Sequence, residues 1–342
     1  MPEAHDALVH RLRRQADNCR QLGSPFYASL LEAAAADVEV EGPAWDVLHA
    51  FEQESSRAAV ALRLTGAVHR LVLDDTLPEL AARYPSTGGD GDARAAWPLF
   101  RQALVEHRDE ITRLVANGCQ TNEVGRSAAL LGGFLEVAHR TRLPLRILEI
   151  GASAGLNLRW DRFRYEAFEG AWGDPASPVR FDHAFDVPPP FQRTADVVER
   201  KGCDLNPIDP TSEEGALTLR SFVWADQLSR LALLDGAIAM AQTMPVEVEK
   251  IDAASFLERE LAEPRRGVAT VVYHSVFMQY VAPPERERIN QAVERAARAS
   301  SLAAPFHHLY MEPVHSVFEI RLDSELLGTS LAHGTNVVWL VP

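Results

Sequence analysis

Apolar residues recur every three or four positions through the first 143 residues, a spacing typical of amphipathic helices. Leu8 and Leu12 lie on one face of a first predicted helix. Ser24 and Pro25 are good residues for the cap and first turn of a second helix over 26–38. Further helices are predicted over 45–73, over 94–116 and from Thr121 or Asn122 to 142, with a loop at 86–92.

From Leu145 onward, short apolar runs alternate with helical patterns. The predicted strands are 145–150, 197–203, 246–251, 269–274 and 308–311, and the predicted helices are 215–244, 253–261 and 284–300. This alternation predicts a parallel sheet covered on both faces.

Two regions depart from the alternation. The apolar runs 318–322 and 337–341 have no helix between them, which predicts an antiparallel hairpin on the sheet edge. Residues 164–195 are rich in Gly and Pro, which predicts an insertion that contains a hairpin and loops. We therefore expect a helical domain over 1–143 and an α/β domain over 144–342, the first acting as a lid or substrate domain.

The composition narrows the class of protein. No apolar run approaches the roughly 20 residues that span a bilayer, and the first residues are polar and acidic, unlike a signal peptide. The net charge of −14 disfavours nucleic acid as a partner. The three cysteines suit a reducing cytoplasm and form neither a disulfide framework nor a metal site. The oligomeric state is left open.

A glycine-rich turn follows the first predicted strand, with Glu149 at the strand end and Gly151 and Gly155 in the turn. We expect a helix to begin there, with its free N–H groups and dipole facing a ligand and Glu149 as a fixed negative charge. A dinucleotide fingerprint is incomplete, because Ser153 and Leu156 stand at glycine positions. The spelling G-x-S-x-G also permits a hydrolase with Ser153 as nucleophile.

The E-x-G-x-x-x-G spacing resembles motif I of class I S-adenosylmethionine-dependent methyltransferases. The resemblance continues through Cys203–Pro207, Ile251–Ala253 and Val271–Phe277, and in the closing hairpin. It implies a Rossmann-like fold, an S-adenosylmethionine cofactor and a set of binding residues. That set is Glu149, Gly151, Ala152, Ser153, Gly155, Asn157, Asp204, Asp252, Ala253, His274 and Ser275.

The identity of the ribose-binding acid stays open. About 50 residues separate Gly155 from Asp204, roughly twice the usual offset, and the insertion has to account for the gap. Glu166 and Glu169 are the alternatives.

The chain also resembles an uncharacterised bacterial family of unknown function over most of its length. The segments that carry this resemblance are 121–126, 172–175, 204–207 and 224–227. It implies a methyltransferase-like fold but no established reaction.

Methyl transfer needs alignment of the reacting atoms more than a fixed catalytic signature, so the catalytic candidates come from polar clusters. They are Glu123, Arg126, Trp224, Asp226 and His274. The sequence favours a methyltransferase with a small-molecule or protein acceptor. A non-catalytic S-adenosylmethionine or nucleoside-binding protein is the second hypothesis, and the serine hydrolase is the third.

Overall fold

The computed structural model describes residues 2–54, 58–315 and 317–341. The chain forms two compact units, and each is discontinuous in sequence. The helical unit comprises Met1–Thr121 and Ser212–Ala232, and the α/β unit comprises Asn122–Thr211 and Leu233–Pro342. This division differs from the predicted boundary at 143 in two ways. Helix α8 (Arg126–Thr141) belongs to the sheet, and residues 212–232 return to the helices.

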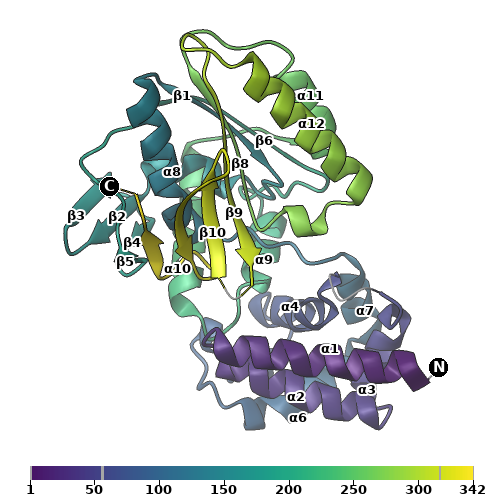
Figure 1. Cartoon of the computed structure of the whole chain (residues 1–342). Coiled ribbons are helices and arrows are strands. Elements are labelled where there is room, and N and C mark those ends of the chain that lie inside the picture. The colour runs from purple at the N-terminus through teal and green to yellow at the C-terminus, as the bar shows by residue number, and fades with distance from the viewer. Residues whose placement is uncertain (1, 55–57, 316, 342) are drawn as a thin grey trace. The chain divides into compact units, whose positions relative to one another are not determined.

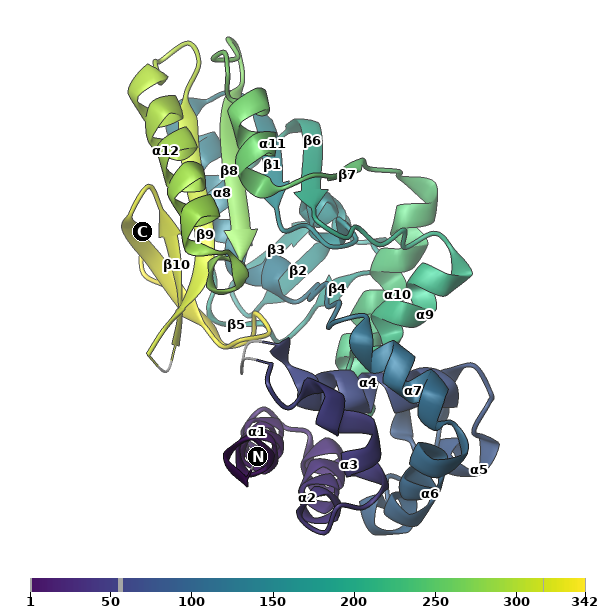
Figure 2. The same cartoon turned by 90° about the vertical axis from the view of Figure 1, so that its right-hand side faces the viewer.

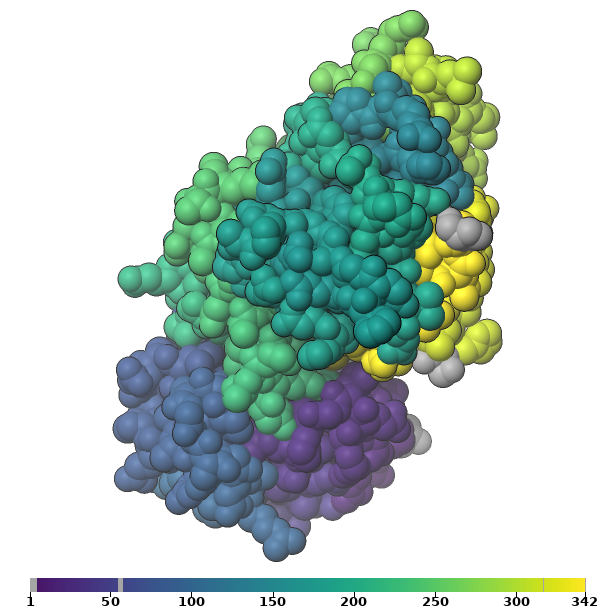
Figure 3. All heavy atoms as spheres, turned by 90° about the vertical axis from the view of Figure 1, so that its left-hand side faces the viewer, coloured from purple at the N-terminus to yellow at the C-terminus, as the bar shows by residue number. Residues whose placement is uncertain are grey.

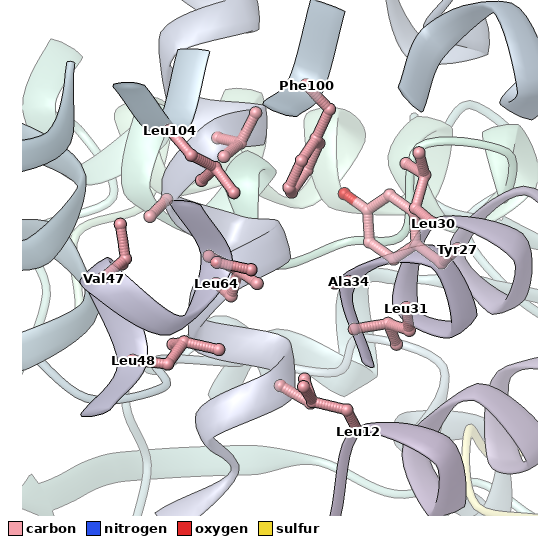
Figure 4. Packing of buried hydrophobic residues seen from close by; sticks show 14 of the residues in the cluster. Leu12, Tyr27, Leu30, Leu31, Ala34, Val47, Leu48, Leu64, Phe100 and Leu104 are labelled. Carbon is pink, nitrogen blue, oxygen red and sulfur yellow. The ribbon is translucent and has the colours of Figure 1, made fainter. Parts of the chain in front are cut away.

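The helical unit is built around one apolar core, formed by the buried faces of its helices. Leu12, Leu31, Leu48 and Leu64 meet there from four different segments (Figure 4). Trp224, from the returning segment, is part of the same core. The elements are α1 (Pro2–Gln21), α2 (Pro25–Glu39), α3 (Pro43–Leu48), η1 (His49–Phe51), α4 (Val60–Leu73), α5 (Pro78–Ala81), η3 (Pro85–Thr87), α6 (Ala93–Glu106), α7 (Arg108–Ala116) and α9 (Glu213–Ser221).

Several long predicted helices are divided in the structure. The prediction over 45–73 becomes α3, η1 and α4, and Ala59, with φ of 51°, interrupts the helical path just before α4; residues 55–57 lie outside the described residues. The prediction over 94–116 divides at His107, whose φ of −115° ends α6. The prediction over 215–244 becomes α9 and α10 (Leu228–Thr243). For 45–73 and 94–116 the apolar periodicity continues through the break because both parts pack on the core of the helical unit. The 215–244 prediction instead runs from the helical unit into the α/β unit.

The α/β unit contains a nine-stranded sheet in the order β5-β12-β11-β10-β9-β8-β1-β6-β7 (Figures 1 and 2). Its parallel strands are β1 (Leu145–Ile150), β6 (Val197–Asp204), β7 (Val248–Lys250), β8 (Ala269–Ser275) and β9 (Phe306–Val314). In chain order these lie 3-2-1-4-5, which is the doubly wound arrangement. The predicted Rossmann-like α/β fold is confirmed, and the strand order reverses between β1 and β8.

The tail forms an antiparallel meander of β10 (Val317–Leu322), β11 (Glu325–Ser330) and β12 (Val337–Trp339). The predicted hairpin contained only the first and last of these strands. The middle strand, β11, contains Gly328. This glycine breaks the short run of apolar residues, so the strand is hard to recognise in the sequence.

Helices cover the two faces of the sheet. Helix α8 packs on one face, where Phe134 meets Tyr273 of β8 edge-on at 5.0 Å. Helices α11 (Ala253–Glu260) and α12 (Pro283–Ala299) cover the other face, where Leu148 and Ile150 of β1 join their apolar core (Figure 2). The alternation of β1 side chains between two buried faces explains its continuous apolar run.

The insertion forms a three-stranded sheet of β3 (Gly170–Gly173), β2 (Arg164–Ala167) and β4 (Arg180–Phe181). The predicted hairpin is β2–β3, whereas β5 (Phe185–Val187) leaves the insertion and pairs with β12. Trp160 stacks on Phe134 of α8 at 4.3 Å and on Trp172 of β3 at 5.5 Å. These rings tie the insertion to α8, and its residues (teal) form a broad surface in Figure 3.

Candidate functional site

The glycine turn lies at the carboxyl end of β1, beside the point where the strand order reverses. Gly151, Ser153 and Gly155 all have positive φ, at 68°, 53° and 65°. The turn leads into η4 (Leu156–Arg162), a short 3-10 helix, and the expected α-helix is absent from this place. The prediction of an α-helical N-terminus facing a ligand is therefore wrong.

Several N–H groups of the turn are bonded within the protein. Ala152 N donates to Cys203 O at 2.9 Å, and Gly155 N donates to Ala152 O at 2.7 Å. Leu156 N donates to the side-chain oxygen of Asn122 at 3.0 Å. A ligand at this turn thus meets side chains and the remaining backbone groups, and does not meet a ring of unsatisfied donors.

Asp204 ends β6 and contacts the glycine turn directly. Its carboxylate accepts from Ser153 N at 2.9 Å and from Asn206 N at 2.9 Å. Glu166 lies in the insertion sheet, where it pairs with Arg164 at 2.8 Å and Arg180 at 2.7 Å. Glu169 follows β2 in the turn before β3. Of the three acids that the sequence left open, Asp204 is the one bonded to the turn.

Glu149 is buried on the α8 side of β1, and its Oε2 accepts from Tyr273 Oη at 3.0 Å. Burial raises the pKa of this carboxyl to about 8, although the Tyr273 bond opposes the rise. Burial thus favours the neutral form of Glu149 over the fixed negative charge expected from the sequence. A protonated carboxyl both donates and accepts hydrogen bonds.

The segment before α8 connects three parts of this edge. Asn157 Nδ2 donates to Glu123 O at 3.1 Å, and the Glu123 carboxylate lies 3.0 Å from Nδ1 of His333 in the β11–β12 loop. Arg126 donates to Ser275 O at the end of β8, at 3.2 Å. The helix predicted to begin at 121 or 122 begins at Arg126 in the structure. Asn122 does not cap this helix, because its side chain caps η4.

His274 is buried at the end of β8, and its Nδ1 lies 2.9 Å from Oε1 of Glu312 in β9. The same oxygen accepts from the backbone N–H groups of Phe277 and Met278. The Phe277 ring lies against Gly151, where a Cβ atom would overlap the ring. Sequence reasoning missed Phe277 and Glu312. The alternation of polar residues at 308, 310 and 312 on one face of β9 was the available signal.

Ser153 has a strained backbone, and its Oγ is buried with no hydrogen-bond partner among the described residues. A hydrolytic nucleophile needs a base within hydrogen-bond reach. The geometry brings no histidine to this hydroxyl within the described part of the chain. Its orphaned hydroxyl instead suits a polar ligand atom at the turn.

The remaining predicted residues have roles in helix capping and packing. Asp252 is the N-cap of α11 and accepts from Ser255 N at 2.9 Å, and Ala253 is buried behind it. Trp224 and Asp226 lie in the helical unit, where Trp224 packs in the core and Asp226 accepts from Phe26 N at 3.0 Å. The candidate site in the α/β unit is therefore built without Trp224 and Asp226.

No helix among the described residues is both long and apolar enough to cross a membrane. Searches of curated proteins and of solved structures found no match. A family model described as "Uncharacterized protein conserved in bacteria (DUF2332)" matches residues 9–339. The resemblance to an uncharacterised bacterial family is thereby confirmed, and the chain belongs to this family.

Proposed function

We propose that the protein is an S-adenosylmethionine-dependent methyltransferase acting on a small-molecule or protein acceptor. The observation that carries the proposal is the bond between Ser153 N and the Asp204 carboxylate, 2.9 Å long. It joins the turn after the first parallel strand to the acid after the second, at the edge where doubly wound sheets bind ligands.

The residues at this edge fit such a cofactor in their chemistry. Each oxygen of the Asp204 carboxylate accepts one backbone N–H and keeps a lone pair for a ribose hydroxyl. The buried Ser153 Oγ offers an unused donor and acceptor to the amino-acid portion. In its protonated form, which burial favours, Glu149 adds a further donor near the turn without an uncompensated buried charge.

Bound S-adenosylmethionine supplies an activated methyl group. The chain would supply orientation and exclude water, and these two effects account for much of the rate in a direct displacement. A base is needed only when the acceptor atom loses a proton. Two pairs of an acid and a histidine lie near the carboxyl ends of the parallel strands and would accept such a proton. They are Glu123–His333 and Glu312–His274.

Calorimetric titration with S-adenosylhomocysteine tests the proposal. The wild type should bind, and Asp204→Ala should lower the affinity at least about tenfold, because hydrogen bonds to a charged group are lost. Glu166→Gln is the matched control, since it alters the rival acid in the other sheet and should leave affinity unchanged. Absence of binding to the wild type would reject the proposal. Binding without turnover across many acceptors would favour a non-catalytic binding protein.

A further inference from the structure

The space beside Gly151 is filled by the ring of Phe277. A Cβ atom on Gly151 would overlap Cδ2, Cε2 and Cγ of that ring, so ring and backbone are in close contact. Gly151 belongs to the same turn as Ser153, where the proposed function puts the cofactor, and is one of the binding residues implied by the motif I resemblance. The inference below rests on that function, because it requires ring and cofactor to compete for one space.

Glu312 holds the Phe277 segment in this position. Its Oε1 accepts from Phe277 N at 2.8 Å, from Met278 N at 3.0 Å and from His274 Nδ1 at 2.9 Å. Burial alone would raise the pKa of Glu312, but the bonds from His274 and the two amides keep it below its ordinary value. Oε1 of Glu312 thus accepts three hydrogen bonds, and two of them come from the backbone N–H groups of Phe277 and Met278.

The segment is strained at one end and anchored on both sides. Val276 has φ of 53°, in the left-handed region that a β-branched residue rarely adopts. Val276 N is bonded to Met311 O at 2.8 Å, and Arg286 donates to Met278 O at 2.8 Å. These anchors confine any movement to the short stretch 276–278. Loss of the Glu312 bonds would remove two backbone hydrogen bonds from this strained segment, while Tyr280 N would still donate to Phe277 O at 3.0 Å.

We propose that Phe277 is a plug over the glycine turn and that Glu312 is the positioning residue that keeps the plug closed. Cofactor binding moves the ring off Gly151, and the closed population lowers the apparent affinity. Glu312 acts through the backbone of Phe277 and Met278 and does not touch the cofactor.

Hydrogen exchange of the ligand-free protein tests the role of Glu312 without any cofactor. Glu312→Ala should speed exchange of the Phe277 and Met278 amides about tenfold or more, since both lose a charged acceptor. Glu319→Ala is the matched control. Glu319 is the neighbour of Glu312 on β10 and pairs with Arg321. Equal exchange in the two variants, at equal melting temperatures, would overturn this role for Glu312.

Titration with S-adenosylhomocysteine tests the plug. Phe277→Ala and Glu312→Ala should bind about threefold more tightly or better than the wild type, because the closed state is removed. Tyr280→Ala, an exposed aromatic in the same segment, should match the wild type. Equal affinity of wild type and Phe277→Ala would overturn the plug and leave the proposed function standing. Binding to neither would reject the cofactor, and the exchange result would still decide the role of Glu312.

Discussion

At the scale of single residues, Glu149 shows how burial changes the chemistry that a sequence suggests. From the sequence, an acidic residue at the end of an apolar strand is expected to be a negative charge beside the ligand. In the folded unit it is enclosed on the α8 face with Tyr273, and its pKa rises to about 8. Desolvation, together with the negative charge of Asp204, outweighs the opposing effects of the Tyr273 bond and of Arg159.

This shift predicts a dependence of stability on pH. The unfolded chain releases the Glu149 proton near pH 4.5, while the folded protein keeps it until about pH 8. Between these values the native state binds more protons, so the free energy of unfolding falls as pH rises, by at most about 1.4 kcal/mol per pH unit. Glu149→Gln removes this loss, so its stability advantage should grow from pH 5 to pH 8 and then level off.

Urea unfolding at pH 5, 6, 7, 8 and 9 measures the difference. Glu166→Gln serves as control, because the Glu166 carboxylate is paired near the surface and its pKa is lowered by Arg164. An advantage of Glu149→Gln that is the same at pH 5 and pH 9 would contradict the prediction.

At the scale of elements, distant segments cap helices that the local sequence leaves uncapped. Ser24 precedes α2 as expected, but its own side chain does not accept from the first turn. Asp226 does so instead, because it accepts from Phe26 N and from the Ser24 hydroxyl. Asn122 likewise caps η4 from the segment before α8. The segment 224–227 therefore has a role in holding the helical unit together.

Asp226→Ala should destabilise the helical unit by about 1–2 kcal/mol, because α2 loses its capping carboxylate and two donors lose their acceptor. Denaturant unfolding followed by circular dichroism measures the change. Glu110→Ala is the comparison, since it breaks a surface pair with Arg113 that is worth well under about 1 kcal/mol. Equal effects of the two substitutions would show that Asp226 does not act as the cap.

At the scale of the whole molecule, the helical unit is completed by residues 212–232, which follow the insertion and β6 in the chain. Phe222 packs closely on Gly66 of α4, and Ser221 O lies 3.1 Å from His69 Nδ1. Trp224 and Ala225 add to the core. Residues 1–121 alone therefore lack part of their own packing.

We expect a fragment of residues 1–143 to lack a cooperative thermal transition, because the unit loses α9 and the core side chain of Trp224. A chain of residues 1–121 joined to 212–232 by a flexible linker should restore the transition. Near-ultraviolet circular dichroism during heating distinguishes them. A cooperative transition of the shorter fragment, equal to that of the linked chain, would refute the role of the returning segment.

The sequence by itself determined the class of fold and the order of most elements. Helical periodicity before Leu145 and alternating strands after it appear in the structure, as do the strand–glycine turn and Asp204 at the end of β6. These features depend on local patterns of apolar residues and on glycine positions, which neighbours in the chain already fix.

Only the tertiary structure decided how distant segments combine. Three contacts join residues far apart in sequence. Residues 212–232 pack in the helical unit, Asn122 caps η4, and Phe277 contacts Gly151. The raised pKa of Glu149 likewise depends on its burial beneath α8 and beside β8. Such contacts and pKa shifts arise from packing across segments, and no local periodicity records which segments will meet.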